Sequence, residues 1–441
     1  MGDPTVVGNA ASAGRAVTTT PGPSDSSGRN TVVLVVITAI TNLADGVTKI
    51  AFPLMATTLT NSPFQISAVS LTLTLPWLLA ALHVGVLVDR VDRRKLLWLA
   101  NIARVIVVLG VLAANAAGAV TLPLLYIGGL ILGVAEVIAL TAATAVVPDA
   151  VAPPGRQRIN TWMAGAETVC NEFAGPLLGG LLVVVGASFA LGGTAAGYVV
   201  GMVALLFLVG KFRPARPEGK PESLNSQIRD GLSFLWGQPV LRLMALVLTI
   251  LCACWGVWLG LMPLVATQQM GLDASGYGIL LSALGVGGLF GALVVSTVNR
   301  WLGRQFVMFA NIFLTLALVL MPAVTTNLVA VAAGAFCGGM GGTLWSINAR
   351  TIAQQLVSSE MMGRYSAAAK MFSWGSFPVG AGLAGVLAEW FGTQVAFWIF
   401  SVATLTLILP FLRIFTAEAL AKIDAGDVAV RGTETAPEPE K

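Results

Sequence analysis

This sequence contains few charged residues. Only 10% of its 441 residues are Asp, Glu, Lys or Arg, whereas 56% are hydrophobic and the mean hydropathy is +0.83. Soluble domains carry about 25% charged residues, so this composition excludes an ordinary soluble protein. Apolar runs of about 20 residues recur along the chain, and each is long enough to cross a bilayer as a helix. The sequence therefore predicts a polytopic all-α membrane protein embedded in a lipid bilayer.

Histidine and cysteine are also scarce, which excludes several kinds of chemistry. His83 is the single histidine, and all four cysteines fall inside apolar runs, so neither a metal site nor a loop disulfide is expected. The sequence contains neither a Gly-x-Ser-x-Gly elbow nor a phosphate-binding Gly-x-x-x-x-Gly-Lys loop. We expect no enzyme activity and no cofactor, so any transport must draw on an ion gradient. The pI near 9.0 reflects basic loops at a membrane surface, and no nucleic-acid partner is expected.

The hydropathy pattern predicts twelve transmembrane helices, arranged as two halves of six. The ranges are 31–57, 66–88, 96–117, 122–147, 160–186, 190–210, 240–266, 276–298, 304–323, 327–349, 366–388 and 393–413. The predicted divisions of the chain are a disordered tail over 1–30, an N-terminal half over 31–210, a linker over 211–239, a C-terminal half over 240–413 and a second tail over 414–441. A monomer is expected.

Basic residues alternate between the loops. The loops near 58–65, 114–121, 187–192, 267–275, 322–328 and 389–394 contain no Lys or Arg. The other loops hold nearly all of them, and the positive-inside rule makes those loops cytoplasmic. Both termini are therefore expected in the cytoplasm, and the linker from Lys211 to Gln238, with an amphipathic segment from Leu224 to Trp236, is expected there too.

The two halves repeat each other in sequence. At a shift of 210 residues, Gly46-Val47 aligns with Gly256-Val257, and Asp89-Arg90 aligns with Asn299-Arg300. Parallel six-helix repeats are typical of transporters in which two halves rock about a central cavity. The duplication therefore favours an alternating-access carrier.

The loop between the second and third predicted helices carries a family motif. It reads Gly85-x-x-x-Asp89-Arg90-x-Asp92-Arg93-Arg94, and it resembles the Gly-x-x-x-Asp-Arg-x-Gly-Arg-Arg signature of the major facilitator superfamily, with Asp92 in place of the family glycine. This Asp-containing form is similar to the branch of macrolide-efflux and enterobactin-export proteins. The resemblance implies the twelve-helix fold of that superfamily and an exporter in the bacterial inner membrane. A gating role is expected for Gly85, Asp89, Arg90, Arg93, Arg94, Arg300 and Arg304, with a merely solvated loop as the alternative.

A second motif lies in the fifth predicted helix. Gly175-Pro176-Leu-Leu-Gly179-Gly180 resembles a Gly-Pro-x-x-Gly-Gly segment associated with antiporting exporters of this superfamily. Small residues let helices approach closely and proline bends them, which suits a hinge. Ordinary close packing of a glycine-rich helix is the alternative.

Charges inside the predicted membrane helices indicate the coupling site, because a charge at the bilayer centre costs roughly 2.5–3.5 kcal/mol on insertion scales. Asn42, Asp45 and Lys49 share one face of the first helix, and the aligned positions of Asp45 and Lys49 in the seventh helix are apolar. Asp45 is a candidate proton carrier and cargo ligand. The alternative is a structural Asp45–Lys49 pair that neutralises itself.

Three further carboxylates lie in the fourth and fifth helices. Glu136 is expected to be a lone mid-membrane acid and a second proton carrier, with a contact to Arg104 as the alternative. Glu167 and Glu172 are about 140° apart on the helix wheel, so they face different partners, and each is expected either to bind a cationic cargo or to pair with Arg104. Glu172 is the third candidate for proton coupling. Arg104 is too deep to reach the surface easily, so a buried carboxylate partner is expected.

The C-terminal half offers aromatic surface in place of charge. Trp255, Trp258, Trp345 and Trp374 are expected to form an apolar wall for a bulky amphipathic cargo, and aromatic rings would also accept a cationic one. Lipid-facing or interfacial tryptophan is the alternative. The predicted function is proton-coupled export of amphipathic small molecules such as antibiotics or siderophores. A lipid or nutrient carrier of the same fold and a non-transporting receptor are the alternatives.

Overall fold

The computed structural model describes residues 23–210, 212, 224–358 and 361–416. Within these ranges some side chains are not described, and those of Asp89 and Glu172 are among them. The described chain is almost entirely helical. The helices are α1 (Pro23–Ala56), α2 (Pro63–Leu79), α3 (Ala81–Arg90), α4 (Arg93–Ala116), α5 (Leu122–Ala150), α6 (Pro153–Glu167), η1 (Thr168–Ala174), α7 (Gly175–Val185), α8 (Ala187–Leu206), α9 (Leu224–Gly237), α10 (Pro239–Leu264), η2 (Val265–Gln269), α11 (Ala274–Val324), α12 (Leu328–Leu356), α13 (Met362–Ser373), α14 (Ser376–Phe391), α15 (Thr393–Leu405) and α16 (Ile408–Ile414).

Ten stretches of the described chain are helical, long and apolar enough to cross a membrane. One of them, Gly276–Val324, turns sharply at Gly303, whose φ of 79° favours glycine, so it supplies two spans. The shorter apolar helix Pro63–Leu79 continues into α3 and supplies another. This arrangement is consistent with twelve spans, several of which are broken by proline or by a π-turn.

Short polar side chains fix where several helices begin. Ser62 and Asn327 precede α2 and α12 and accept hydrogen bonds from backbone N–H groups of the first turn. Asp92 does the same for α4, accepting from the N–H groups of Arg94 and Lys95 at 3.0 and 3.3 Å. The residue that departs from the family glycine is therefore a helix cap.

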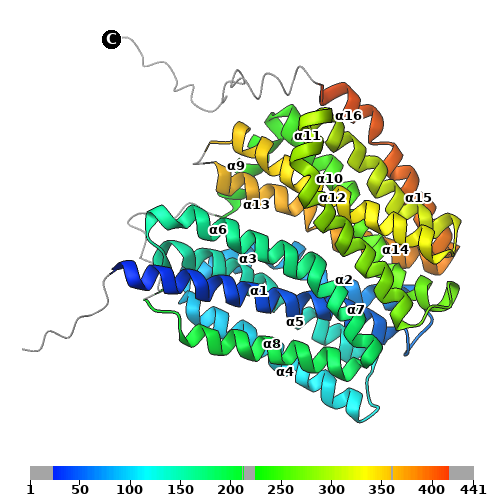
Figure 1. The fold of residues 1–441 in the computed structure, drawn as a ribbon, viewed down its shortest axis with the longest axis horizontal. Coiled ribbons are helices and arrows are strands. Elements are labelled where there is room, and N and C mark those ends of the chain that lie inside the picture. Colours follow the sequence, from blue (N-terminus) through cyan, green and yellow to red (C-terminus); the bar gives the residue numbers. More distant parts are fainter. Residues whose placement is uncertain (1–22, 211, 213–223, 359–360, 417–441) are drawn as a thin grey trace, which may run out of the picture.

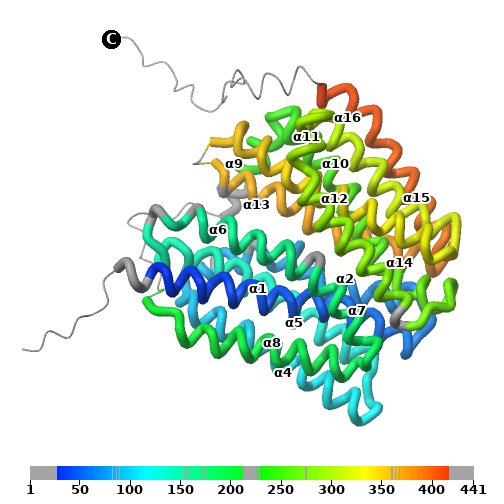
Figure 2. The backbone as a smooth tube through the Cα atoms, in the orientation of Figure 1, coloured from blue at the N-terminus to red at the C-terminus, as the bar shows by residue number. Residues whose placement is uncertain are grey.

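Two helical bundles lie side by side (Figure 1). Helices α1–α8 form one bundle and α9–α16 the other, and the tube in Figure 2 shows the same division from blue to green and from green to red. Buried apolar clusters lie around Val137 in the first bundle and around Ile312 in the second, and the clusters around Phe52 and Trp258 also include residues of the other bundle. Helix α9, which contains the predicted amphipathic segment, packs on α13 of the second bundle.

The bundles meet at one end and diverge at the other (Figure 1). Their main contacts run between α2 and α14, between α2 and α10 and between α7 and α11. At the meeting end, the loops without Lys or Arg touch across the interface, where Gln268 donates a hydrogen bond to Asn61 at 2.7 Å. A cavity between the bundles is therefore closed on that side.

The first helix begins earlier than expected. Residues 23–30 were predicted to belong to a disordered tail, but α1 starts at Pro23. Asn30 is buried and ties α1 to the ends of two neighbours, donating to the carbonyls of Ala150 and Val209 at 3.0 and 2.8 Å. Composition alone misses these contacts because they depend on helices far away in the sequence. The rest of this predicted tail, residues 1–22, lies outside the described residues, as do residues 417–441 of the C-terminal tail.

Candidate functional site

A cavity of about 260 Å³ lies between the two bundles. This volume is slightly below the roughly 300–1,000 Å³ typical of small-molecule sites. The first bundle contributes Lys49, Asn171 and Pro176, among others, and the second contributes mainly apolar and aromatic residues. Of the residues predicted to bind cargo, the cavity is lined by Lys49, Trp255, Trp345 and Trp374.

Lys49 joins the cavity wall to a buried acid. Its Nζ lies 2.8 Å from Glu136 Oε1 and 2.9 Å from Asn171 Oδ1. The Asn171 amide also donates to Glu136 Oε1 at 2.9 Å and to Asn42 Oδ1 at 3.0 Å. The expectation that Glu136 is a lone carboxylate is therefore wrong, because Lys49 on α1 reaches across to α5 and neutralises it.

Asp45 belongs to a second buried pair. Its Oδ2 lies 2.7 Å from the Arg104 guanidinium, and its Oδ1 accepts a hydrogen bond from the Tyr198 hydroxyl at 2.7 Å. Arg104 also stacks over the Tyr198 ring at 5.1 Å. Arg104 therefore has the buried carboxylate partner that was expected. The alternative of a self-neutralising Asp45–Lys49 pair is wrong, because each of these residues has its ion-pair partner on another helix.

Neither acid lines the cavity directly. Asp45 and Glu136 are only 5% and 3% exposed, and both lie behind the wall that Lys49 and Asn171 form. Two acids and two bases in one apolar bundle leave the cluster without net charge, which limits the cost of burial. The pair that touches the cavity is Lys49–Glu136, so it is the better placed of the two to respond to cargo.

Stacked aromatic rings form the wall opposite Lys49. Trp374 stacks on Trp77 of the other bundle at 5.2 Å and on Phe377 at 5.7 Å, and Lys49 Nζ lies 5.7 Å from the Trp374 ring centre. Trp258, by contrast, is fully buried in an apolar cluster of the second bundle and does not line this cavity. Its predicted role as a cargo contact is therefore not supported.

Neutral polar groups complete the second bundle's side of the cavity. They are Asn311, Thr315, Thr343, Ser346 and Ser373, and none of them was predicted as a site residue. Asn171 and Tyr198 were also missed. All of these missed residues are single polar or amphipathic side chains inside apolar helices. Such a residue is a weak signal of a site, because polar side chains often make ordinary contacts between membrane helices.

The two acids of the fifth predicted span, Glu167 and Glu172, are not seen to line the cavity in the described part of the chain. Glu167 is half-buried on α6 and is not among the residues that line the cavity, whereas Glu172 is a predicted site residue whose side chain lies outside the described part. Their proposed roles in cargo binding and proton coupling stay predictions.

The predicted hinge glycines are places of very close helix contact. A methyl group added to Gly175 would lie 2.7 Å from the Gly46 Cα on α1, and one added to Gly179 would lie 3.0 Å from Val47. One added to Gly180 would lie 3.0 Å from Gly278 on α11 of the other bundle. Pro176 lines the cavity, and the π-helical η1 directly precedes the motif. The segment therefore combines close packing with irregular backbone at the bundle interface.

The predicted gating arginines bind helix ends within their own bundle. Arg93 pairs with Asp149 of α5 at 2.5 Å, and Arg94 donates to the Leu205 carbonyl of α8 at 3.1 Å. Gly85 on α3 has open space where a side chain would stand, and Arg90 and Arg300 are exposed. Arg304 donates to Gln355 at 3.1 Å. The Asp89 side chain is outside the described residues, so the gating role of this segment stays a prediction.

Comparisons with known proteins identify relatives along most of the chain. The sequence profile of the Major Facilitator Superfamily matches residues 34–378. The multidrug efflux pump Tap of Mycolicibacterium fortuitum is 28% identical over 410 residues, which cover 87% of this chain and 97% of the pump. The enterobactin exporter EntS of Shigella dysenteriae is 31% identical over 254 residues, or 56% of this chain and 58% of the exporter.

Solved structures show the same fold at low identity. A bacterial homologue of the iron transporter ferroportin, in an inward-facing state, superposes with a TM-score of 0.67 at 14% identity and covers 87% of this chain and 98% of its own. The nucleoside transporter NupG gives a TM-score of 0.66 at 13% identity, covering 88% of this chain and 99% of its own.

Proposed function

The chain belongs to the Major Facilitator Superfamily, and from that premise we propose that it is a proton-coupled exporter of amphipathic small molecules in the bacterial inner membrane. Family membership makes it a multi-pass membrane transporter rather than an enzyme. The observation that carries the finer proposal is the Lys49–Glu136 pair on the wall of a cavity between two bundles. The names of the relatives, a multidrug efflux pump and a siderophore exporter, support the outward direction.

The proposed cycle uses the two ends of the bundles in turn. Under the positive-inside rule, the loops rich in Lys and Arg face the cytoplasm, so the bundles diverge towards the cytoplasm and meet on the outer side. Cargo enters from the cytoplasm while Glu136 is ionised and paired with Lys49. Rocking of the bundles then exposes the cavity outside, where the cargo leaves, Glu136 takes up a proton, and the empty bundles return to the inward-open state.

A pH gradient alone should drive transport in this scheme. Proteoliposomes with an acidic lumen are expected to accumulate amphipathic dyes, because each cargo that enters allows a proton to leave. The measurement is dye fluorescence in protein-containing and empty vesicles, across a panel of dyes of different charge. A passive lipid or nutrient carrier would equilibrate dye regardless of the gradient, and a receptor would move none, so either result would refute the proposal.

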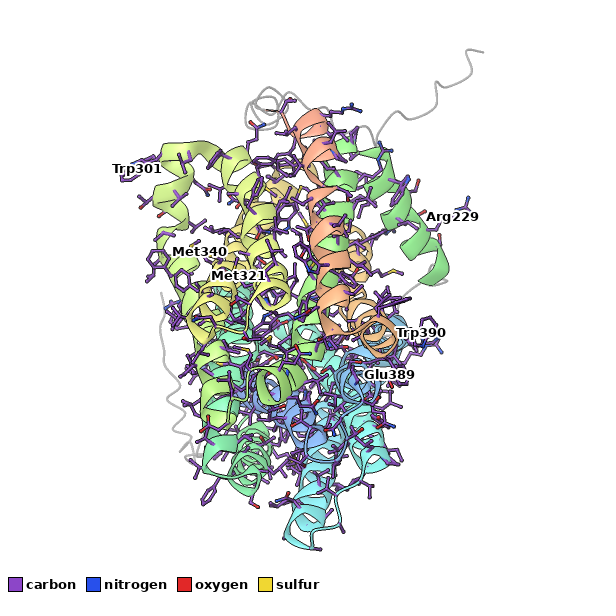
Figure 3. The ribbon with its side chains drawn as sticks, turned by 90° about the vertical axis from the view of Figure 1, so that its right-hand side faces the viewer. Arg229, Trp301, Met321, Met340, Glu389 and Trp390 are labelled. Carbon is purple, nitrogen blue, oxygen red and sulfur yellow. The ribbon has the colours of Figure 1, made fainter. Side chains whose placement is uncertain are left out.

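A single carboxylate links the bundles at the outer end. Glu389 Oε2 on α14 accepts hydrogen bonds from the Ser62 hydroxyl at 2.8 Å and from the Phe64 N–H at 3.3 Å, both at the start of α2. Figure 3 shows Glu389 where the C-terminal helices meet α2. In the six loops of this end the charged residues are Asp273 and Glu389, and Asp273 accepts from the Gly276 N–H of its own helix α11. Glu389 is therefore placed to hold the outer end closed, since a carboxylate at a helix N-terminus is favourable.

Removal of this contact should favour opening at the outer end. Glu389→Ala is expected to raise the outward-open population several-fold, because a bonded helix N-terminal carboxylate contributes about 0.5–2 kcal/mol. Spin labels at the exposed outer positions Ala119 and Gln394 would measure the distance between bundles. Asn327→Ala is the control, since it removes a cap of α12 within one bundle. An unchanged distance distribution in Glu389→Ala would show that the contact does not hold the gate.

A further inference from the structure

The cavity presents a cation towards its interior, whereas the acids lie behind it. Lys49 is the charged residue among those that line the cavity in the described part of the chain. A lysine ammonium has three N–H donors. Glu136 and Asn171 accept two of them, and the Nζ lies 5.7 Å from the ring centre of Trp374, which also lines the cavity. The third donor is therefore available to an acceptor on the cargo.

The opposite wall also carries donors without partners. The Trp345 indole N–H and the Thr343 hydroxyl, on α12, have no hydrogen-bond partner, and these residues are 2% and 8% exposed. Both residues line the cavity. An indole N–H can only donate, and a buried donor left unpaired is costly, so a cargo oxygen that displaces the groups covering this N–H would satisfy it.

These observations point to a cargo class. We propose that the cavity binds oxygen-rich amphipaths that are uncharged or acidic, through Lys49 on one wall and Trp345 on the other, and that it disfavours permanent cations. This inference rests on the proposed function, because it specifies the cargo of the same site. It replaces the expectation of a cationic cargo: a cation would approach Lys49 first, and Asp45 and Glu136 are shielded from it by their own bases.

Binding of two dyes that share a xanthene ring system tests the preference. The anionic dye fluorescein and the cationic dye rhodamine 123 would be titrated with purified protein in detergent, with fluorescence polarisation as the readout. Fluorescein is expected to bind at least about 10-fold more tightly than rhodamine 123. Lys49→Gln is expected to weaken fluorescein binding and strengthen rhodamine 123 binding, because it exposes the Glu136 charge. Opposite changes for two dyes cannot result from general damage to the fold.

A matched pair of tryptophan variants tests the second wall. Trp345→Phe keeps an aromatic ring and removes the N–H, and it is expected to weaken fluorescein binding about 3–10-fold, the usual effect of losing one hydrogen bond. Trp258→Phe is the control, because Trp258 is equally buried and its indole N–H is also unpaired, yet it does not line the cavity. This control should bind fluorescein as the wild type does.

Four results would overturn the inference. The first three are no measurable fluorescein binding, rhodamine 123 binding as tight as that of fluorescein, and equal effects of Trp345→Phe and Trp258→Phe. A preference for rhodamine 123 that disappears in Glu172→Gln would identify that acid as a cation site and would also refute it. Because the titration uses no gradient, its failure would leave gradient-driven export standing, and the proteoliposome assay would test that separately.

Discussion

Replacing Asp45 with alanine is expected to lower the free energy of unfolding by about 3–5 kcal/mol, the usual cost of leaving a buried charge without its partner. Arg104 is fully buried, and Asp45 Oδ2 at 2.7 Å is its charged partner. The substitution also removes the acceptor of the Tyr198 hydroxyl. Arginine is always charged in proteins. The charge would therefore remain in an apolar bundle.

Thermal unfolding in detergent measures this effect, with the amount of folded protein recovered as a second readout. The matched variant is Asp45→Ala combined with Arg104→Met, which removes both charges and keeps much of the arginine volume. This double variant is expected to recover most of the lost stability, because replacing both members of a buried pair by apolar groups is often neutral. If the single and double variants unfold at the same temperature, Arg104 is not held by Asp45.

Much of the fold could be predicted from the sequence, because hydrophobic runs and loop charges are local signals. Hydropathy located the spans, and the Gly85–Arg94 motif indicated the superfamily to which the chain belongs. The start of α1 was missed because Asn30 is fixed by Ala150 and Val209, contacts that no local window contains.

The site was predicted less completely, since the residues were identified and their pairing was not. Asp45, Lys49, Arg104 and Glu136 all lie in one cluster, but helical spacing suggested an Asp45–Lys49 pair. The partners actually come from α4 and α5, and which helix faces which is a tertiary property. Asn171 and Tyr198, which hold the two pairs in place, gave no stronger signal than any polar residue in an apolar run.

The two pairs differ in their access to the cavity, and this difference assigns them different roles. The Arg104 and Asp45 side chains are 1% and 4% exposed, so that pair is sealed within the first bundle. The Lys49 side chain is 19% exposed and lines the cavity, so protons and cargo can reach its pair with Glu136. We therefore expect the first pair to stabilise the bundle and the second to couple protons to cargo. Substitutions at the two acids should then fail in different ways.

Glu136→Gln is expected to reduce gradient-driven dye accumulation in proteoliposomes by at least about 10-fold while leaving dye exchange at equal pH intact. Glutamine has the shape of the protonated acid, so it can still accept hydrogen bonds from Lys49 and Asn171 but cannot release a proton. The loss of stability should be smaller than in Asp45→Ala, because water in the cavity can reach Lys49.

Glu167→Gln is the comparison for this experiment, since it neutralises a half-buried acid of the same bundle that does not line the cavity, and wild-type accumulation in it would also remove Glu167 as a predicted cargo ligand. Accumulation at the wild-type rate in Glu136→Gln would move the coupling role to another acid, with Asp45 and Glu172 as the remaining predicted carriers. Loss of both accumulation and exchange would instead show that Glu136 is needed to bind cargo or to move the bundles. Dye exchange at equal pH requires the bundles to rock but requires no net proton transfer. Loss of gradient-driven accumulation with exchange retained is therefore the only result consistent with a carboxylate whose proton is exchanged for cargo.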